Sequence, residues 1–178
     1  MSEGSILQIV PQLPGTLDGV GDYALTLARA LSARHGLKTV FVVARETSAE
    51  AIDGFEVISG FQADRVRQCL AKGCAHVILH YVNYGYQTRG IPFALLRFAR
   101  ELREQLQGRW VTTFHEIYAW GPPWKSEFWL RPFQVKIARE LIDLSDVCFV
   151  SNAAVEQEIH LHDAQKEVHL VPVMSNFG

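Results

Sequence analysis

The fold class is indicated first by Ser5-Ile-Leu-Gln-Ile-Val10 with the loop Pro11-Gln-Leu-Pro-Gly-Thr-Leu-Asp-Gly-Val-Gly-Asp22 that follows it. The first segment is short and rich in β-branched residues, which predicts a strand. After the loop, apolar residues recur at helical spacing from Val20 to Leu31, and Gly36 is placed to end that helix. A strand, a glycine loop and a helix in this order form the first half of a βαβ unit.

The rest of the chain alternates short β-branched runs with longer segments of helical period. Strands are expected at 39–43, 55–58, 76–80, 109–114, 147–150 and 168–171, and helices at 62–71, 93–106, 128–144 and 153–160. This alternation predicts an α/β fold, namely a Rossmann-like three-layer α/β/α domain with a mainly parallel sheet. The 178 residues, 48% of them hydrophobic, suffice for one core but not for two. Residues 1–178 are therefore expected to form a single domain.

Charge and composition exclude several kinds of partner. A net charge of −2 with 20% charged residues gives no electrostatic basis for nucleic-acid binding. The three cysteines, Cys69, Cys74 and Cys148, form no CxxC pair, and we interpret them as buried thiols of a reducing compartment. No stretch approaches the roughly 18 apolar residues of a membrane helix. These observations predict a soluble, cytoplasmic protein.

The first glycine loop has the composition of an anion site. Gly19 and Gly21 lie where a helix begins, and free backbone amides and the helix dipole favour an anion there. Against this, Asp18 and Asp22 would repel a phosphate. The alternative is that proline and glycine only shape a turn and that Asp18 caps the helix.

The same loop also fits a dinucleotide-binding module. Gly19-Val-Gly-Asp-Tyr-Ala24 matches G-x-G-x-x-A, and Glu46 lies near the position expected of a ribose-binding acid. That fingerprint should follow its strand immediately, whereas residues 11–18 intervene here. This intervening segment weakens the match, and an NAD(P)-type Rossmann domain is kept as an alternative.

Two further loops follow predicted strands, where ligands of parallel sheets bind. His80-Tyr-Val-Asn-Tyr-Gly-Tyr-Gln-Thr-Arg-Gly90 carries three tyrosines, and Thr113-Phe-His-Glu-Ile-Tyr-Ala-Trp-Gly-Pro-Pro-Trp124 places His115 just beyond a strand. A histidine there can donate a hydrogen bond or exchange a proton near neutral pH. The alternative is that these side chains close the core. Ala119 replaces the second histidine of a zinc motif, so no metal is predicted.

Taken together, these segments resemble a known family. The Pro-x-Leu-Pro-Gly loop with its Asp-Gly-Val-Gly21, the His80 segment with Gly90-Ile-Pro92, Thr113-Phe-His-Glu116 and Phe149-Val-Ser-Asn152 are similar to the N-terminal domain of glycosyltransferase family 4. The resemblance implies a retaining GT-B enzyme in which this domain holds mainly the acceptor. A second domain would bind a nucleotide-sugar, which we expect to be a UDP- or GDP-sugar. The intact protein would be a hexosyltransferase with no cofactor.

The resemblance also suggests roles for particular residues. Gly19 and Gly21 would approach the donor diphosphate, and His115 would be the catalytic residue beside the transferred sugar. Our own candidates for acceptor contacts are Tyr84, Tyr86, Trp120 and Trp124. The acceptor itself is expected to be a carbohydrate or a lipid-linked sugar.

The donor half of such an enzyme has no counterpart here. The basic residues and the Glu-x7-Glu motif of the C-terminal donor domain are absent from these 178 residues. Micromolar binding requires about 8 kcal/mol, whereas a helix N-terminus supplies roughly 0.3 to 2 kcal/mol toward an anion. We therefore expect the domain to need its own C-terminal domain as a partner and to be inactive alone. A third alternative is a non-catalytic module that binds a ligand or a protein.

The helix expected at 93–106 carries Arg97, Arg100 and Arg103 beside apolar residues. This pattern is compatible with peripheral contact at the inner face of an anionic membrane. Glu101 and Glu104 offset part of the charge, and packing on the sheet would explain the same pattern.

Overall fold

The computed structural model describes residues 4–13, 19–118, 124 and 126–171. Within them, one sheet has the strand order β3-β4-β2-β1-β5-β6-β7-β8, parallel throughout except that β3 is antiparallel to β4. The strands are β1 (Ser5–Val10), β2 (Lys38–Val43), β3 (Ala51–Ile52), β4 (Phe55–Ser59), β5 (Cys74–Tyr81), β6 (Trp110–Phe114), β7 (Val147–Val150) and β8 (Glu167–Leu170). The helices are α1 (Gly19–His35), α2 (Ala63–Ala71), α3 (Asn83–Tyr86), α4 (Phe93–Gln105), α5 (Ser126–Leu144) and α6 (Ala153–His162).

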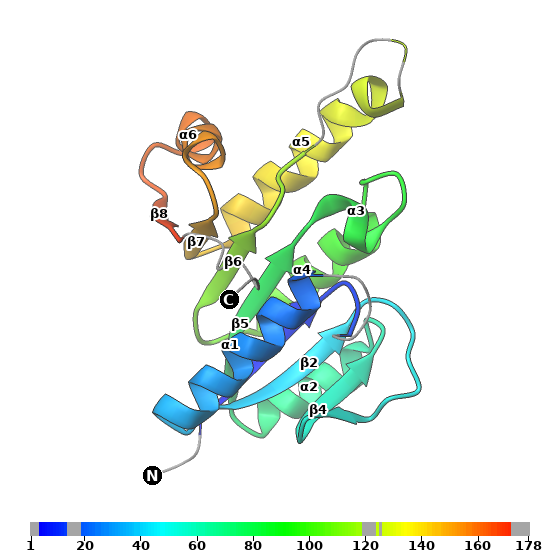
Figure 1. Ribbon diagram of the computed structural model, residues 1–178, viewed down its shortest axis with the longest axis vertical. Coiled ribbons are helices and arrows are strands. Elements are labelled where there is room, and N and C mark those ends of the chain that lie inside the picture. Colours follow the sequence, from blue (N-terminus) through cyan, green and yellow to red (C-terminus); the bar gives the residue numbers. More distant parts are fainter. Residues whose placement is uncertain (1–3, 14–18, 119–123, 125, 172–178) are drawn as a thin grey trace.

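Helices cover both faces of the sheet, which confirms the predicted α/β fold. Helix α1 crosses in front of the strands in Figure 1 and packs its small buried residues Ala24 and Ala28 on β1 and β2. Helices α2, α4 and α5 contribute to the larger core on the opposite face. Strands β1 and β2 are buried on both faces, which explains their continuous hydrophobic sequence.

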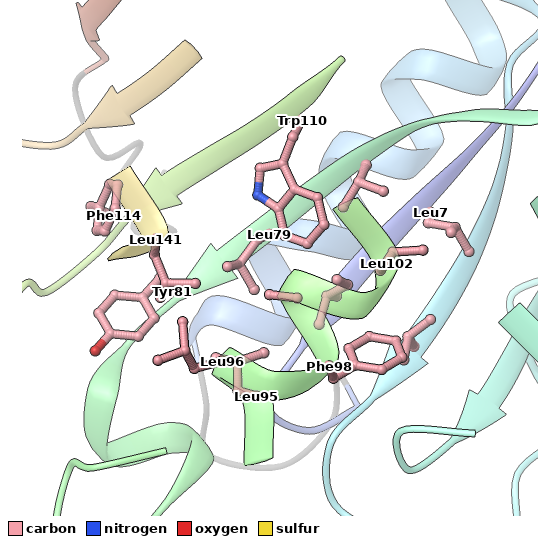
Figure 2. Close-up of a cluster of buried hydrophobic side chains, with 14 of the residues drawn as sticks. Leu7, Leu79, Tyr81, Leu95, Leu96, Phe98, Leu102, Trp110, Phe114 and Leu141 are labelled. Atoms are coloured by element: carbon pink, nitrogen blue, oxygen red, sulfur yellow. The ribbon is translucent and has the colours of Figure 1, made fainter. Parts of the chain in front are cut away.

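The larger core joins the sheet to α4 and α5. Figure 2 shows leucines of α4 packed against Leu79 and the indole of Trp110. Trp110 is completely buried, and its Nε1 donates to Oγ1 of Thr112 at 3.1 Å. The buried aromatic ring therefore keeps its one polar atom satisfied.

The connection order creates a topological switch between β1 and β5. From β1 the chain moves outward through β2 and β4, then returns to place β5 on the other side of β1. The loops after β1 and β5 consequently diverge at the carboxyl edge of the sheet. This divergence is the usual origin of a ligand crevice in open parallel sheets.

Two short elements were not predicted. Strand β3 pairs with β4 through a tight turn in which Asp53 and Gly54 both have positive φ. Helix α3 is a single turn within the tyrosine-rich loop, where the side chain of Asn83 accepts from the amide of Tyr84 at 2.9 Å. Neither element is long enough to leave a periodic pattern in the sequence.

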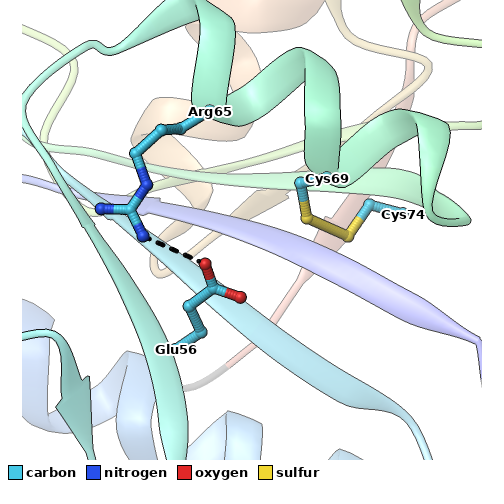
Figure 3. The surroundings of a disulfide bond; sticks show 4 residues. All are labelled: Glu56, Arg65, Cys69 and Cys74. Carbon is cyan, nitrogen blue, oxygen red and sulfur yellow. Dashed lines mark hydrogen bonds and ion pairs between the residues drawn. A yellow bond between two sulfur atoms is a disulfide. The ribbon is translucent and has the colours of Figure 1, made fainter.

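The interpretation of all three cysteines as thiols was wrong. Cys69 at the end of α2 and Cys74 at the start of β5 form a disulfide, while Cys148 is free and buried (Figure 3). The turn at Lys72 and Gly73 brings the two Cα atoms to 5.6 Å, which their separation in sequence does not reveal. The cysteine argument for a reducing compartment therefore loses its basis.

Candidate functional site

The candidate site lies at the switch point, where the start of α1 meets the loops after β5 and β6. Tyr23, in the first turn of α1, contacts the rings of both His80 and His115 edge-on, at centroid distances of 5.7 and 5.4 Å. The amide of His115 donates to the carbonyl of Tyr81 at 3.0 Å, which extends the β5–β6 ladder by one residue. The structure therefore brings His115 beside the helix that begins with Gly19 and Gly21.

A line of polar side chains crosses the sheet beneath His115. Nε2 of His80 lies 2.8 Å from Oε1 of Gln8, and Nε2 of Gln8 donates to Oγ1 of Thr39 at 3.4 Å. All three side chains are buried. Because Oε1 of Gln8 can only accept, His80 must carry its proton on Nε2.

That tautomer fixes the neighbouring contact. Nδ1 of His80 becomes an acceptor, and Nε2 of His115 lies 3.5 Å from it in a long hydrogen bond. His115 is therefore the donor, with its proton on Nε2.

Burial keeps His80 neutral. Removal from water and, to a smaller extent, the proximity of His115 together lower the pKa of His80 to about 3. The buried His80 ring therefore acts as a neutral hydrogen-bond partner of His115.

Of the predicted tyrosines, Tyr84 lies in the site and Tyr86 is used by the fold. The hydroxyl of Tyr86 lies 2.8 Å from the carbonyl of His80 and 3.1 Å from that of Ile9, so it ties the ends of β5 and β1 together. The hydroxyl of Tyr84 accepts from Nε2 of Gln134 on α5 at 3.3 Å. Gln134 also donates to the carbonyl of Arg89 at 3.1 Å, which holds the tyrosine loop against α5.

A hollow of about 610 Å³ opens beside His115, between the loops after β5 and β6 and the start of α6. Its charged lining residues are Glu116 and Glu158, and its neutral polar groups include Tyr84, Asn152 and Gln157. This lining favours hydroxyl-rich ligands over anions. A second, small hollow of about 20 Å³ adjoins the other side of His115 and includes Tyr23 and Ser151.

Tyr118 forms part of the rim of the larger hollow. The guanidinium of Arg131 lies over its ring, 5.1 Å from the centroid. Burial and a hydrogen bond to Glu158 raise the pKa of the Tyr118 phenol. Tyr118 thereby joins α5 and α6 at the mouth of the hollow.

The remaining predicted residues are less informative. Gly19 is the first residue of α1, and a Cβ built there meets no atom within 4 Å. Asp18 and Trp120 lie outside the described residues, and Trp124 is 84% exposed. Gln8 was not predicted, since a single glutamine in a hydrophobic strand is its only signal in the sequence.

Two features of the structure weaken the dinucleotide alternative: the long connection from β1 to α1 and the position of Glu46. Strand β1 ends at Val10 and α1 begins at Gly19, so the tight turn of that fingerprint is absent. Glu46 lies three residues beyond β2, in a separate hollow with Thr47, Ser48 and Ser59.

Across the described residues there is no group of three or more His, Cys, Asp or Glu side chains arranged to hold a metal ion. None of the helices in that part of the chain is long and apolar enough to span a bilayer.

The fold is that of a Rossmann-like domain found in sugar-transferring enzymes. The chain superposes on sucrose-phosphate synthase from Thermosynechococcus elongatus with a TM-score of 0.59 and 13% identity, covering 97% of this chain and 90% of that one. It also superposes on an alpha-glucosyltransferase solved with UDP and a 13-mer DNA containing an HMU base, with a TM-score of 0.54 and 13% identity. That match covers 93% of this chain and 42% of the glucosyltransferase chain.

Sequence comparison adds no family to this likeness in fold. No protein-family model matches the chain, and no curated protein matches it.

Proposed function

We propose that this chain is the acceptor-side domain of a retaining, nucleotide-sugar-dependent glycosyltransferase. The observation that carries the proposal is the contact of Tyr23 with His115, because it joins the glycine-opened start of α1 to a histidine at the switch point of the sheet. Both superposed structures belong to sugar transferases, and one of them was solved with UDP. This combination favours sugar transfer over the dinucleotide and non-catalytic alternatives.

In the proposed reaction, the oxygen of an acceptor hydroxyl bonds to the anomeric carbon on the face from which the nucleoside diphosphate leaves, so that configuration is retained. The proton of the hydroxyl passes to the departing diphosphate. The amides at the start of α1 would stabilise charge that develops on the diphosphate. His115 would donate a hydrogen bond beside the transferred sugar. The basic groups that complete this stabilisation would come from a C-terminal donor domain.

The hollow beside His115 is the proposed acceptor site. Glu116 and Glu158 disfavour a phosphorylated or carboxylated acceptor, whereas Tyr84, Asn152 and Gln157 can bind hydroxyl groups. We therefore propose a neutral, hydroxyl-rich acceptor. Tyr86 is not retained as an acceptor contact, because its hydroxyl already bridges two strand ends.

Donor binding can be tested on this chain by NMR titration with UDP-glucose and GDP-glucose. We expect weak binding that perturbs the amides of residues 19–23 and the ring of His115. Gly19→Ala should abolish these perturbations, because the added methyl has room in the free protein but would obstruct a phosphate. Ser32→Ala, on the exposed far end of α1, is the matched control. Perturbations confined to the hollow around Glu46 would instead support the dinucleotide alternative.

The role of His115 can be tested in a protein that contains the donor domain. His115→Ala should lower the transfer rate by about 100-fold or more, the usual contribution of a positioned proton donor or acceptor. Circular dichroism should remain unchanged. An unaltered rate would remove the assigned role.

A further inference from the structure

The first turns of α5 present a cluster of exposed aromatic side chains. Phe128, Trp129 and Phe133 are 42%, 68% and 51% exposed, Trp124 before the helix is 84% exposed, and Phe93 at the start of α4 is 53% exposed. These five residues are called the aromatic face below. Such concentrated aromatic exposure is unusual on a soluble surface and marks a place of contact.

An ion pair between α4 and α5 relates the level of Phe93 on α4 to that of Phe133 on α5. Arg100 of α4 pairs with Glu140 of α5. Both helices run antiparallel to the strands they connect, so they run parallel to each other. Phe93 and Phe133 each lie seven residues before a member of that pair, which places them at about the same level, roughly two turns from it.

Charge is segregated along the same two helices. Residues 93–100 and 128–139 contain Arg97, Arg100, Arg131, Lys136 and Arg139 but no acidic residue. Glu127 precedes the second range, and the acids Glu101, Glu104, Glu140 and Asp143 follow the two ranges. Arg97, Lys136 and Arg139 are exposed, whereas Arg131 lies over Tyr118. Exposed basic residues therefore lie beside the aromatic face on both helices.

This surface differs from the one that the sequence suggested. Arg103 of α4 is bound to Asp146 and to the carbonyl of Gly108, and Arg100 is paired with Glu140. Only Arg97 of the three arginines in 93–106 adds to the aromatic face. The aromatic residues come mainly from α5, for which no membrane contact was predicted.

We propose that the aromatic face and its exposed basic residues form a docking surface for an anionic phospholipid membrane. The first turns of α5 extend beyond the carboxyl ends of the strands (Figure 1), so the face is part of a projecting ridge that can enter a bilayer interface. Aromatic rings favour the headgroup boundary, and lysine and arginine beside them attract anionic lipid. The inference does not depend on sugar transfer, since it rests on different residues and a different surface.

The test is co-sedimentation of the full chain with vesicles of phosphatidylserine and phosphatidylcholine, compared with phosphatidylcholine alone. We expect binding to the anionic vesicles that weakens with salt. The double variant Trp129→Ala, Phe133→Ala should weaken it by about tenfold or more. Lys136→Gln and Arg139→Gln should each weaken it by about fivefold.

The matched control is Leu161→Ala with Leu170→Ala, because these leucines are 74% and 50% exposed but lie on α6 and β8. The control should bind as the unmodified chain does, and all variants should keep their circular dichroism. Absence of binding to anionic vesicles overturns the proposal, as does equal binding to neutral vesicles or an equal loss in the control. Conversion of a dimer to a monomer by the aromatic variant, without vesicle binding, would assign the face to a second copy of the chain.

Discussion

Nδ1 of His80 faces Nε2 of His115 at 3.5 Å, with the two rings stacked at 28°. The contact joins a completely buried ring to one that borders the candidate acceptor hollow. Gln8, in the middle of β1, determines which nitrogen of His80 is protonated. Gln8 therefore influences the hydrogen bond of His115 through the side chain of His80.

The pH dependence of stability should report the buried His80. Its pKa is lowered to about 3 in the folded protein, whereas in the unfolded chain it is near 6.5. Between these values the unfolded state binds a proton that the folded state excludes, so falling pH favours unfolding. The expected slope approaches about 1.4 kcal/mol per pH unit. Urea unfolding of His80→Gln should lack this slope, and His169→Gln, at an exposed histidine, should retain it.

Gln8→Leu should destabilise the protein by about 1 to 3 kcal/mol, because Nε2 of His80 would then be buried without its acceptor. Gln12→Leu is the matched control, since the bond of Gln12 to Arg45 is exposed, and it should cost at most about 0.5 kcal/mol. Nitrogen chemical shifts of His80 should also reveal a mixed tautomer in Gln8→Leu. Equal stabilities of the two variants would contradict the assigned hydrogen bond.

Gly90→Ala should disturb the loop that carries Tyr84. Gly90 has a φ of +66°, and a Cβ there would lie 2.7 Å from Nε2 of Gln134 and 3.1 Å from Nδ2 of Asn83. The cost should be roughly 2 to 4 kcal/mol, part of it from the left-handed backbone. Gly60→Ala shares that backbone, with a φ of +69° and open space, and should cost only about 1 kcal/mol. Thermal unfolding of both variants measures the difference.

Thiol labelling should distinguish the bridged cysteines from the free one. Denatured without reductant, the chain should accept one alkylating group, at Cys148, and after reduction it should accept three, which mass spectrometry can count. Replacing both Cys69 and Cys74 by alanine should cost about 2 kcal/mol, since the closed loop is short. Labelling of all three cysteines before reduction would show that the disulfide does not form.

Several features could be predicted from the sequence because they depend on local patterns. Alternating β-branched and helical segments indicated the parallel sheet, and β1, β2 and α4 begin or end within one residue of their predicted bounds. Parallel strands align their carboxyl ends, so the loops carrying Gly19, Tyr84 and His115 were expected at the same edge. The prediction could not separate Tyr84 from Tyr86, because their roles depend on which partner each hydroxyl meets.

The sequence by itself determined the fold class and the edge of the sheet at which chemistry is expected, since hydrophobic periodicity and the alternation of strands with helices are encoded in neighbouring residues. Only the tertiary structure decided three other features. They are the hydrogen-bonded contacts from Gln8 through His80 to His115, the disulfide between Cys69 and Cys74, and the placement of Phe93 near the height of Phe133 along the two helices. The hydrogen-bonded contacts and the aromatic face each join residues of different strands and helices. The disulfide depends on the direction taken by the turn between α2 and β5. Such contacts follow from packing in three dimensions, which no local pattern of residues specifies.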